Sequence, residues 1–574
     1  MIDAVGIDTE TEGLGGTITR LGMLCSSGKW YWLSLEEARN NNHWKKEIEE
    51  TDAVVAHNVR YDAGVMKRDL DFEFPWHKTH DTMVMAAMIR PGNAPKDLLT
   101  CAMEELGYDG AEDIAVEDYV EEHDLGSAYH KIPDSILQPY TKRQLLNTLC
   151  LYKKWRKRMP EPAYDMFERV ILKVLMDMED RGVKVDTDVL EDSREKLNEE
   201  IRCIKDDIYE MLDEWDVDLP QKYDGLFGVD LNLNSGDQIA DILIAKGVDL
   251  PETASSTEEK RRYSTSKGTL KSKAGDEPFV DRLLDLREAE KLQSTYVENL
   301  LGYADDNEVI HTNFTTTVTR TGRLSSRSPN LQNQAGHSES AKLIRRAFVP
   351  RDGFRNVEID YSQMEFRFAV YASEDPVGME EIDRGVDFHT AAAAAIYDKD
   401  PEDVTKDERS VGKTSNFAIV YGAGPKKIMR SLDVTRSTAD RILNKWSSHY
   451  QGIWTYKSIL ESNARKNGYI TLPYGRKLFI PEDLAYKSLN YACQGGTADI
   501  IKKAMVEVGD YLSNKRSNQL LQIHDAIVIE EYEDEDVVGD VCKIMRTASD
   551  FCPLDVDAEV WDGSWANKVE IAPF

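Results

Sequence analysis

The sequence predicts an α+β protein with several domains, and three observations support this. The 574 residues exceed what one hydrophobic core serves, because cores stop growing at roughly 250 to 300 residues and longer chains divide. Hydrophobic residues make up 41% and charged residues 30%, an ordinary balance for a soluble globular protein. Strand-like segments alternate with helical ones at the start, long helices fill the middle, and both kinds mix from about residue 310 onward.

The N-terminal region, residues 1–155, is predicted to be an α/β domain with a mixed sheet. Its short apolar runs, AVGID, KWYWLSL and AVVAHN, are typical of strands and are separated by helical stretches. Residues 156–310 have helical periodicity and predict a long helical arm. Three segments show it: 166–185, 190–215 and 279–301. The polar stretch 255–277 within this arm is predicted to be an exposed tip or loop.

The sequence shows no sign of a membrane or a disulfide framework. The opening MIDAVGIDTETEGL has no basic segment followed by an apolar one, and no uncharged apolar run reaches the roughly 18 residues that span a bilayer. The seven cysteines are scattered, odd in number and never spaced as CxxC, which argues against disulfides and zinc. We therefore expect a cytoplasmic protein.

The net charge of −33 is unusual for a nucleic-acid binder, because neutralising phosphates requires clustered Lys and Arg. Two local stretches are nevertheless basic. Residues 309–351 contain seven basic residues and one acid, and residues 464–481 contain four basic residues and no acid. Such runs are usually only solvated faces. Because these two flank the motifs described below, we expect them to contribute to a DNA-binding track.

Two aspartates interrupt apolar, strand-like runs far apart in the chain. Asp360 follows the run in FRNVEIDYSQMEF, and Asp525 follows His524 in QLLQIHDAIVIEE. Burying an unpaired carboxylate is costly, so a cation is expected beside each. Brought together, the two aspartates could bind a pair of Mg²⁺ ions, one activating an attacking oxygen and one stabilising a leaving group. Either aspartate alone is more often a turn or cap residue, so the interpretation depends on the segment between them.

That segment, RSVGKTSNFAIVYG, carries two cations followed by two aromatic residues at intervals of four. The four are Arg409, Lys413, Phe417 and Tyr421. This spacing places them along one slowly winding face of a helix. The cations could hold triphosphate oxygens, and the aromatic rings could stack against a nucleobase and its template partner. The alternative is an amphipathic core helix with snorkelling basic residues.

Together these segments resemble the family A DNA polymerases, the group that includes bacterial DNA polymerase I and several phage replicases. The resemblance covers nearly the whole chain. Its ordered blocks are TGRLSSRSPNLQNQ, DYSQMEFR, DFHTAAA, RSVGKTSNFAIVYG, GYITLPYGRK, LNYACQGGTADIIKKAM and QIHDAIVIE. It implies a right-hand polymerase architecture. The expected division is a thumb at 156–310, a palm formed by 311–388 and 485–574, and fingers at 389–484.

The resemblance also implies roles for individual residues. Asp360 and Asp525 match the catalytic, metal-binding palm aspartates. Arg409, Lys413 and His389 match side chains that hold the incoming triphosphate, and Lys413 is the expected proton donor to the departing pyrophosphate. Phe417 and Tyr421 match residues beside the nucleotide and the templating base, and Glu365 matches the gate that excludes a ribose 2′-hydroxyl. Contacts to primer, template or minor groove are implied for Arg323, Asn330, Gln332, Asn490, Gln494 and His524.

The implied cofactor is a pair of Mg²⁺ ions, with Mn²⁺ able to replace them, and the implied partners are primer-template DNA and dNTPs. A monomer is expected, and the processivity factor stays unknown because no inserted thioredoxin-binding domain is found. The chain departs from many relatives in one place, since Ala526 stands where they carry an acid after the His-Asp pair. Because Asp360 and Asp525 remain, activity is expected to survive.

The N-terminal acids predict a second metal site. Asp8 and Glu10 in GIDTETEG are two residues apart on a predicted strand, so both project from one face, and Asp62 follows in HNVRYD. This set resembles the DnaQ-like 3′ to 5′ exonucleases, which have an RNase H-like α/β fold and bind two metal ions through such acids. The DxE pair alone is weak evidence, because surface acids often explain it.

The third exonuclease motif is incomplete. The family pairs a Tyr with an Asp four residues later; here Tyr140 aligns, but Gln144 stands in the Asp position. Between Asp134 and Glu161 there is no acid that could replace it. A Gln carbonyl can coordinate Mg²⁺ but lacks the negative charge that hard cations prefer. We therefore expect Gln144 still to point toward Asp8 and Glu10, in a weak or inactive exonuclease with an intact fold.

Two other functions stay open on the sequence alone. One is a nuclease whose polymerase-like half only binds DNA, and the other is a non-catalytic DNA clamp. The retained polymerase residues argue against both. Because the sequence begins at the exonuclease-like segment, the separate 5′ nuclease of bacterial DNA polymerase I is expected to be absent. This compact layout is typical of a phage or viral replication enzyme, which would act in the host cytoplasm.

Overall fold

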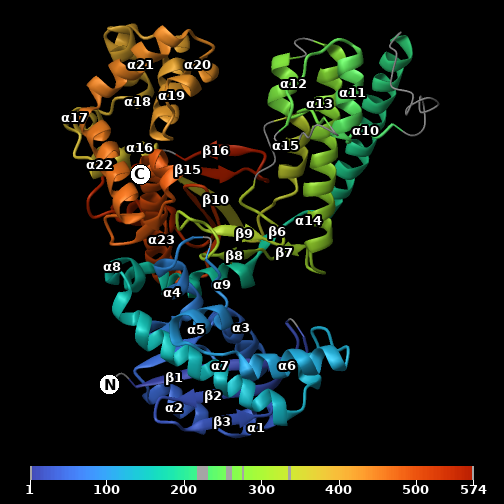
Figure 1. The fold of residues 1–574 in the computed structure, drawn as a ribbon, viewed down its shortest axis with the longest axis vertical. Coiled ribbons are helices and arrows are strands. Elements are labelled where there is room, and N and C mark those ends of the chain that lie inside the picture. Colours follow the sequence, from blue (N-terminus) through green and yellow to red (C-terminus); the bar gives the residue numbers. More distant parts are fainter. Residues whose placement is uncertain are drawn as a thin grey trace.

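A computed structural model describes residues 3–13, 15–92, 94–215, 231–253, 261–273, 277–333 and 338–571. An α/β part formed by the N-terminal residues lies at one end of the molecule (Figure 1). Two helical lobes rise from a central antiparallel sheet at the other end, one containing α10 to α13 and the other α18 to α21 (Figure 1). Within the described residues, no helix combines the length and the apolar character needed to cross a membrane.

The N-terminal sheet has five strands in the order β3-β2-β1-β4-β5. The strands are β1 (Ala4–Thr11), β2 (Ile18–Cys25), β3 (Trp30–Leu33), β4 (Ala53–Ala56) and β5 (Thr79–Asp81). β1, β2 and β3 pair antiparallel, whereas β4 and β5 continue the sheet parallel to β1. The predicted mixed sheet is thus confirmed, although β2 had not been singled out from its sequence.

Seven helices of this part surround the sheet: α1 (Leu35–Asn40), α2 (His43–Glu50), α3 (Val59–Leu70), α4 (Thr82–Ile89), α5 (Leu98–Leu106), α6 (Ala111–Glu122) and α7 (Asp134–Trp155). Helix α7 lies close against β1 and β2 because both strands present glycine to it. A Cβ atom added at Gly6 would lie 3.2 Å from Leu145 Cδ2, and one at Gly22 would lie 2.9 Å from Thr141 Cγ2. These contacts fix how α7 is positioned above β1.

The middle of the chain forms the predicted helical arm. Its helices are α8 (Glu161–Ala163), a π-helical turn (Tyr164–Glu168), α9 (Ile171–Arg181), α10 (Thr187–Glu214), α11 (Gly236–Ala245), α12 (Lys267–Lys273), α13 (Pro278–Lys291), a second π-helical turn (Leu292–Val297) and α14 (Glu298–Tyr303). Short strands β6 (Val183–Lys184) and β7 (Val309–Ile310) pair at its base. Helix α10 buries residues every three or four positions, which is the spacing of one helix face.

The prediction of a loop at 255–277 is wrong in part. Residues 254–260 and 274–276 lie outside the described residues, but α12 forms a helix between them. Leu270 is fully buried there and α12 contacts α13. A single buried leucine among polar residues does not produce a visible periodicity, which is why the sequence pattern suggested a loop.

The central sheet has the order β13-β14-β10-β15-β16, and all its neighbours pair antiparallel. Its strands are β10 (Phe354–Tyr361), β13 (Asn518–Ile523), β14 (Ala526–Tyr532), β15 (Val556–Trp561) and β16 (Lys568–Glu570). Helices α23 (Ser488–Leu512) and α24 (Val538–Thr547) pack on this sheet, and α16 (Met364–Ala372) packs on α23. The two aspartates predicted to bind metal both lie at one end of the sheet, on β10 and in the turn between β13 and β14.

The second helical lobe follows α16. It contains α17 (Pro376–Asp383), α18 (Phe388–Tyr397), α19 (Lys406–Val420), α20 (Pro425–Leu432), α21 (Arg436–His449) and α22 (Gln451–Asn467), then the hairpin of β11 (Tyr469–Thr471) and β12 (Lys477–Phe479). A second hairpin, β8 (Asn313–Thr315) with β9 (Ser325–Arg327), and helix α15 (Glu339–Arg346) precede the central sheet.

Helices α18 and α19 are in direct backbone contact. A Cβ atom at Gly412 would lie 2.2 Å from the carbonyl oxygen of His389, so this position requires glycine. The buried Asn416 donates to the Phe388 carbonyl at 3.0 Å and accepts from the indole of Trp446 on α21 at 2.6 Å. These contacts hold α18, α19 and α21 in one arrangement.

Candidate functional site

Asp360 and Asp525 come together as predicted. Asp360 pairs in register with Ala526, and Asp525 is the second residue of the two-residue turn that precedes β14. His524, the first residue of that turn, has a φ of 54°, in the left-handed region. Asp525 lies close enough to Asp360 for its charge to act on the Asp360 carboxyl group.

The electrostatics of this pair favour a cation. Partial removal of the Asp360 carboxyl group from water, together with the negative charge of Asp525, raises the pKa of Asp360 to about 8. Burial also raises the pKa of Asp525. Two neighbouring carboxyl groups whose pKa values are raised by burial fit a divalent cation, which would offset their negative charge. Across the described residues, no three His, Cys, Asp or Glu side chains form a ready-made metal cluster, either here or at the N-terminal sheet.

Ala526 and Asp557 flank Asp360 on the two neighbouring strands. Both lie directly opposite Asp360, and residues paired in this way project from the same face of a sheet. Asp557 is exposed and accepts a hydrogen bond from Ser362 Oγ at 2.5 Å. The face that lacks an acid at Ala526 therefore has one at Asp557. The sequence did not single out Asp557, because only the strand register brings it beside Asp360.

Glu365 links this pair to the basic and aromatic row. It lies in the first turn of α16, which follows β10. Arg323 donates to one Glu365 oxygen, and the Tyr421 hydroxyl donates to the other at 3.2 Å. Burial, followed by the nearby Glu365 charge, raises the pKa of Tyr421 to about 12, so the hydroxyl stays protonated and able to donate. Three predicted site residues thus meet although they are far apart in the sequence.

The row on α19 has the predicted helical spacing. Arg409, Lys413 and Phe417 lie on the helix and are exposed, and half-buried Tyr421 follows its last residue. The Phe417 ring lies 5.6 Å from the His389 ring and 6.1 Å from the Tyr421 ring, measured between centroids. The alternative of a buried core helix face does not apply to these exposed residues.

Asp387, which pairs with Arg409 of the predicted site, was not singled out from the sequence. It caps α18 by accepting from the Thr390 backbone, and Arg409 donates to both of its oxygens at 3.0 and 2.9 Å. Partial burial works against ionisation, but the bonds from Arg409 and Thr390 prevail and hold the pKa of Asp387 at about 2. The signal was an acid directly before a helix, in the block DFHTAAA. Burial lowers the pKa of neighbouring His389.

Four of the six predicted DNA-binding residues line one pocket of about 330 Å³: Arg323, Asn330, Gln332 and His524. Gln332 donates to the side chain of Gln522 at 2.7 Å, and Gln522 donates to the His524 carbonyl at 2.5 Å. The other two, Asn490 and Gln494, lie one turn apart on α23. The Asn490 side-chain oxygen is buried without a hydrogen-bond partner.

In the two basic stretches, 309–351 and 464–481, some of the basic residues are used for contacts within the protein. Arg351 donates to Glu530 at 2.8 Å and to the carbonyls of Arg181 and Gly182, so it holds the sheet against α9. Arg476 is 5% exposed and forms ion pairs with Glu168 and Asp499. For these two residues the predicted DNA-binding role is wrong, because their charges are neutralised inside the protein.

Comparison with known proteins agrees with this geometry. The model of DNA polymerase family A matches residues 187–567. The chain belongs to DNA polymerase family A. DNA polymerase I of Bacillus subtilis (strain 168) is 30% identical over 473 residues, covering 79% of this chain and 51% of the relative. DNA polymerase I of Chloroflexus aurantiacus is 30% identical over 541 residues, covering 88% of this chain and 54% of the relative.

The chain spans about half the length of these DNA polymerase I relatives. A solved structure titled as the POL domain of Pol1 from M. smegmatis, in complex with DNA primer-template and dNTP, matches with a TM-score of 0.80. The match covers 98% of this chain and 96% of the other at 23% identity, which establishes the fold alone. The predicted α+β multidomain fold of a family A polymerase is confirmed.

The N-terminal acids of this family A chain also lie close together. Asp8 and Glu10 share the face of β1 that α7 covers, and Thr141 on α7 donates to Glu10 at 2.8 Å. Asp62 on α3 is 3% exposed and accepts from the backbone and hydroxyl of Thr9 at 2.9 and 2.7 Å. Each contact joins a helix to β1.

Burial perturbs all three N-terminal acids. It raises the pKa of Asp8 to about 6. Burial and then the Asp8 charge raise the pKa of Glu10 to about 7, and they raise that of Asp62 as well. Acids whose pKa values are raised by their neighbours fit a cation that would neutralise them.

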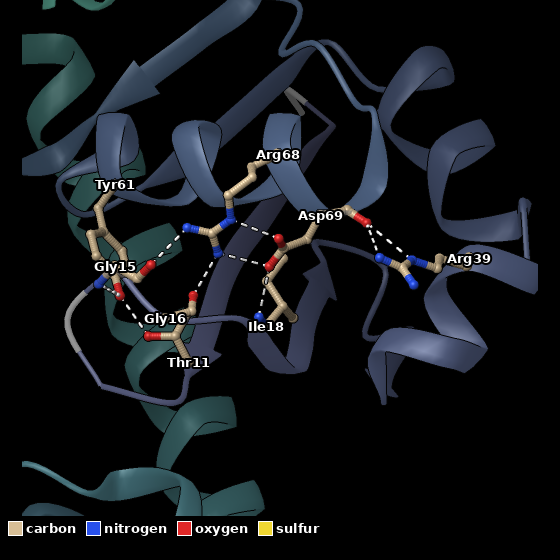
Figure 2. Close-up of polar contacts among 8 residues, drawn as sticks. All are labelled: Thr11, Gly15, Gly16, Ile18, Arg39, Tyr61, Arg68 and Asp69. Carbon is tan, nitrogen blue, oxygen red and sulfur yellow. Dashed lines mark hydrogen bonds and ion pairs between the residues drawn. The ribbon is translucent and has the colours of Figure 1, made fainter. Parts of the chain in front are cut away.

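A polar network fixes the loop between β1 and β2 against α3 (Figure 2). Arg68 donates to both Asp69 oxygens and to the carbonyls of Gly15 and Gly16. Its other contacts join Tyr61 to Thr11, Asp69 to Ile18, and Arg39 to Asp69. The network therefore fixes the position of α3, which carries Asp62, relative to β1, which carries Asp8 and Glu10.

The structure corrects the surroundings expected for Gln144. Its amide nitrogen donates to Asp113 on α6 at 2.6 Å, so an acid lies beside it after all. A search limited to neighbouring sequence missed Asp113, which lies 31 positions upstream. Burial, followed by the charges of Asp8, Glu10 and Asp113, raises the pKa of Tyr140. Tyr140 therefore lies near the same acids.

Proposed function

We propose that this chain is a template-directed DNA polymerase that adds dNTPs to a primer 3′ end. The observation that carries the proposal is the pair Asp360 and Asp525, which the pairing of β10 with β14 brings to the same end of the central sheet. Membership of family A and the fold of the POL domain support it. That relative's complex with primer-template and dNTP suggests the same partners for this chain.

Asp360 and Asp525 would hold two Mg²⁺ ions, which Mn²⁺ can replace. When bound, such ions lower the pKa of the attacking primer hydroxyl and stabilise the charge on the leaving oxygen. Asp557 projects from the same face of the sheet as Asp360.

Arg409, Lys413 and His389 would bind the triphosphate. Arg409 is paired with Asp387 in this structure, and both are accessible, so a triphosphate can compete for the guanidinium at small cost. Lys413 is exposed on the same row of α19 and would donate a proton to departing pyrophosphate. His389 is held near the row by Asn416, whose amide lies 3.3 Å from its Nδ1.

Glu365 would select deoxyribose. Its two oxygens are held by Arg323 and Tyr421, so the carboxylate cannot move aside easily to admit a 2′-hydroxyl. Phe417 would contact the nucleotide, and Tyr421 would lie beside the templating base. Contacts to primer, template and minor groove would come from Arg323, Asn330, Gln332, Asn490, Gln494 and His524, of which four line one pocket.

The lobes then take the roles of a right hand. Residues 156–310 would be the thumb, 311–388 with 485–574 the palm, and 389–484 the fingers. Residues 1–155 would form an RNase H-like 3′ to 5′ exonuclease domain in which Asp8, Glu10 and Asp62 bind metal beside Tyr140. Neutral Gln144 would leave this exonuclease impaired. We further propose that the chain is a monomer and serves phage or viral DNA replication.

A primer-extension experiment tests the proposal. A labelled primer on a longer template is incubated with and without dNTPs and Mg²⁺, using the unmodified chain and Asp525→Asn. Extension that needs both additions and is lost in the variant is expected. Asp306→Asn, which changes an exposed aspartate away from the site, should extend normally. Shortening of the primer without extension would indicate a nuclease, and binding without either reaction would indicate a clamp.

A further inference from the structure

The turn of α7 that carries Gln144 lies over the strand that carries Asp8 and Glu10. Leu145 on α7 contacts the Gly6 position of β1, and Thr141 bonds to Glu10. Asp8 lies between Gly6 and Glu10 on the same face of this strand, because strand side chains alternate. The helical turn from Thr141 to Leu145, which carries Gln144, therefore passes over Asp8.

The contact with Asp113 determines which way the Gln144 amide faces. An ionised carboxylate only accepts hydrogen bonds, so the amide NH₂ must face Asp113. The amide oxygen then faces away from Asp113. Gln144 is 6% exposed, and this oxygen is buried without a hydrogen-bond partner. A buried acceptor without a donor is uncommon and is satisfied by a cation as well as by a hydrogen.

Asp113 is occupied on both sides and is not itself free to bind metal. One oxygen accepts from Gln144, and the other accepts from the Tyr108 hydroxyl at 2.6 Å. The residue is 7% exposed and lies in the first turn of α6, where the helix dipole favours a negative charge. Asp113 therefore acts on a neighbouring metal site through the Gln144 amide, which donates a hydrogen bond to it.

We propose that Asp113 is a positioning residue that converts Gln144 into a neutral oxygen ligand of the exonuclease metal site. The hydrogen bond from the amide to a carboxylate orients its oxygen and makes that oxygen more electron-rich, as outer groups do for other metal ligands. Asp113 thus supplies indirectly part of the charge that the Asp at position 144 supplies in relatives. The inference rests on the proposed exonuclease domain.

Metal affinity is the quantity to measure, because it does not depend on turnover. The full chain carrying Asp360→Asn and Asp525→Asn serves as the parent, so that Mn²⁺ binding followed by electron paramagnetic resonance reports the N-terminal site. Asp8→Asn in this parent should abolish that binding and thereby assigns the signal. Asp113→Asn should weaken Mn²⁺ binding on the order of tenfold, which is the lower end of the effect of changing a residue that hydrogen-bonds to a metal ligand.

An exchange of the two groups separates positioning from simple packing. Gln144→Glu alone places two carboxylates against each other, whereas Asp113→Asn with Gln144→Glu restores an amide donor facing an acid, now in the opposite order. The double variant should bind Mn²⁺ more tightly than either single variant and more tightly than the parent. Tyr108→Phe, which leaves the Gln144 contact intact, should change affinity less than Asp113→Asn does. Melting temperatures of all variants report folding separately.

The outcomes are distinct. Unchanged Mn²⁺ affinity in Asp113→Asn would overturn the positioning role even if the melting temperature falls. The same holds if the change in binding free energy of the double variant equals the sum of the changes in the two single variants. Absence of Mn²⁺ binding in the parent and in every variant would overturn the exonuclease site itself, on which the inference rests. Weakened binding in Asp113→Asn and recovery in the double variant would establish the role.

Discussion

The two carboxylate sites of this molecule differ in what satisfies their charges. At the N-terminal site, Asp62 accepts from Thr9 and Glu10 accepts from Thr141, so the protein itself provides donors. At the central sheet, the charge of Asp525 adds to the effect of burial in raising the pKa of Asp360, so the two carboxylates oppose each other. We expect the N-terminal site to depend less on its altered residue, Gln144, than the central pair depends on either of its aspartates. This contrast predicts which changes have large effects.

The largest effect is expected at the central pair. Asp360→Ala or Asp525→Ala should reduce primer extension by at least roughly 1000-fold, because each change removes half of the metal-binding charge. DNA binding should persist, since neither residue contacts a phosphate. Single-turnover extension and fluorescence anisotropy with labelled primer-template measure the two quantities. Near-normal extension by either variant would remove the basis of the comparison.

Changing Glu365 should alter selectivity more than rate. Glu365→Ala opens the space next to the sugar, so incorporation of a ribonucleotide relative to its deoxy counterpart should rise on the order of 100-fold. Tyr421→Phe keeps the carboxylate but removes one of its two donors, and a smaller rise is expected. Competing dNTP and NTP incorporation on one template gives both ratios. An unchanged preference in Glu365→Ala would reject the gate.

The N-terminal site should show a smaller dependence on its altered residue. With Mg²⁺ or Mn²⁺ and no dNTPs, the unmodified chain should shorten a mismatched primer slowly. Gln144→Asp should speed this by roughly tenfold, because hard cations prefer a charged ligand. Rates from 5′-labelled primers, compared with an Asp8→Asn variant, provide the measurement. Rapid shortening that Gln144→Asp does not increase would mean that position 144 is not a ligand.

The smallest effect concerns stability and tests the donors directly. Thr9→Val removes the hydroxyl donor of buried Asp62 and should lower the free energy of unfolding by about 1–3 kcal/mol. Ser362→Ala removes a donor from exposed Asp557 and should change it by less than about 0.5 kcal/mol. Thermal melts of the two variants under one buffer condition make the comparison. Equal losses would show that burial does not distinguish the two sites.

Local patterns in the sequence were sufficient to single out the residues that we propose for the polymerase site. The interval of four from Arg409 to Tyr421 requires only helix geometry, and an Asp that interrupts an apolar strand is visible as such. Contacts between distant segments were not predictable in this way. Asp113 meets Gln144, and Arg476 meets Glu168 across 308 positions, only because helices and strands pack together. The same limit explains why Arg351 and Arg476 seemed suited to DNA when their charges are used internally.

The close approach of α18 and α19 has a mechanical consequence. With the backbone at Gly412 against the carbonyl of His389 and Asn416 bonded to both α18 and α21, neither helix can slide or turn past the other without breaking buried hydrogen bonds. Any displacement of this lobe toward the central sheet therefore moves His389, Lys413 and Arg409 together as one rigid body.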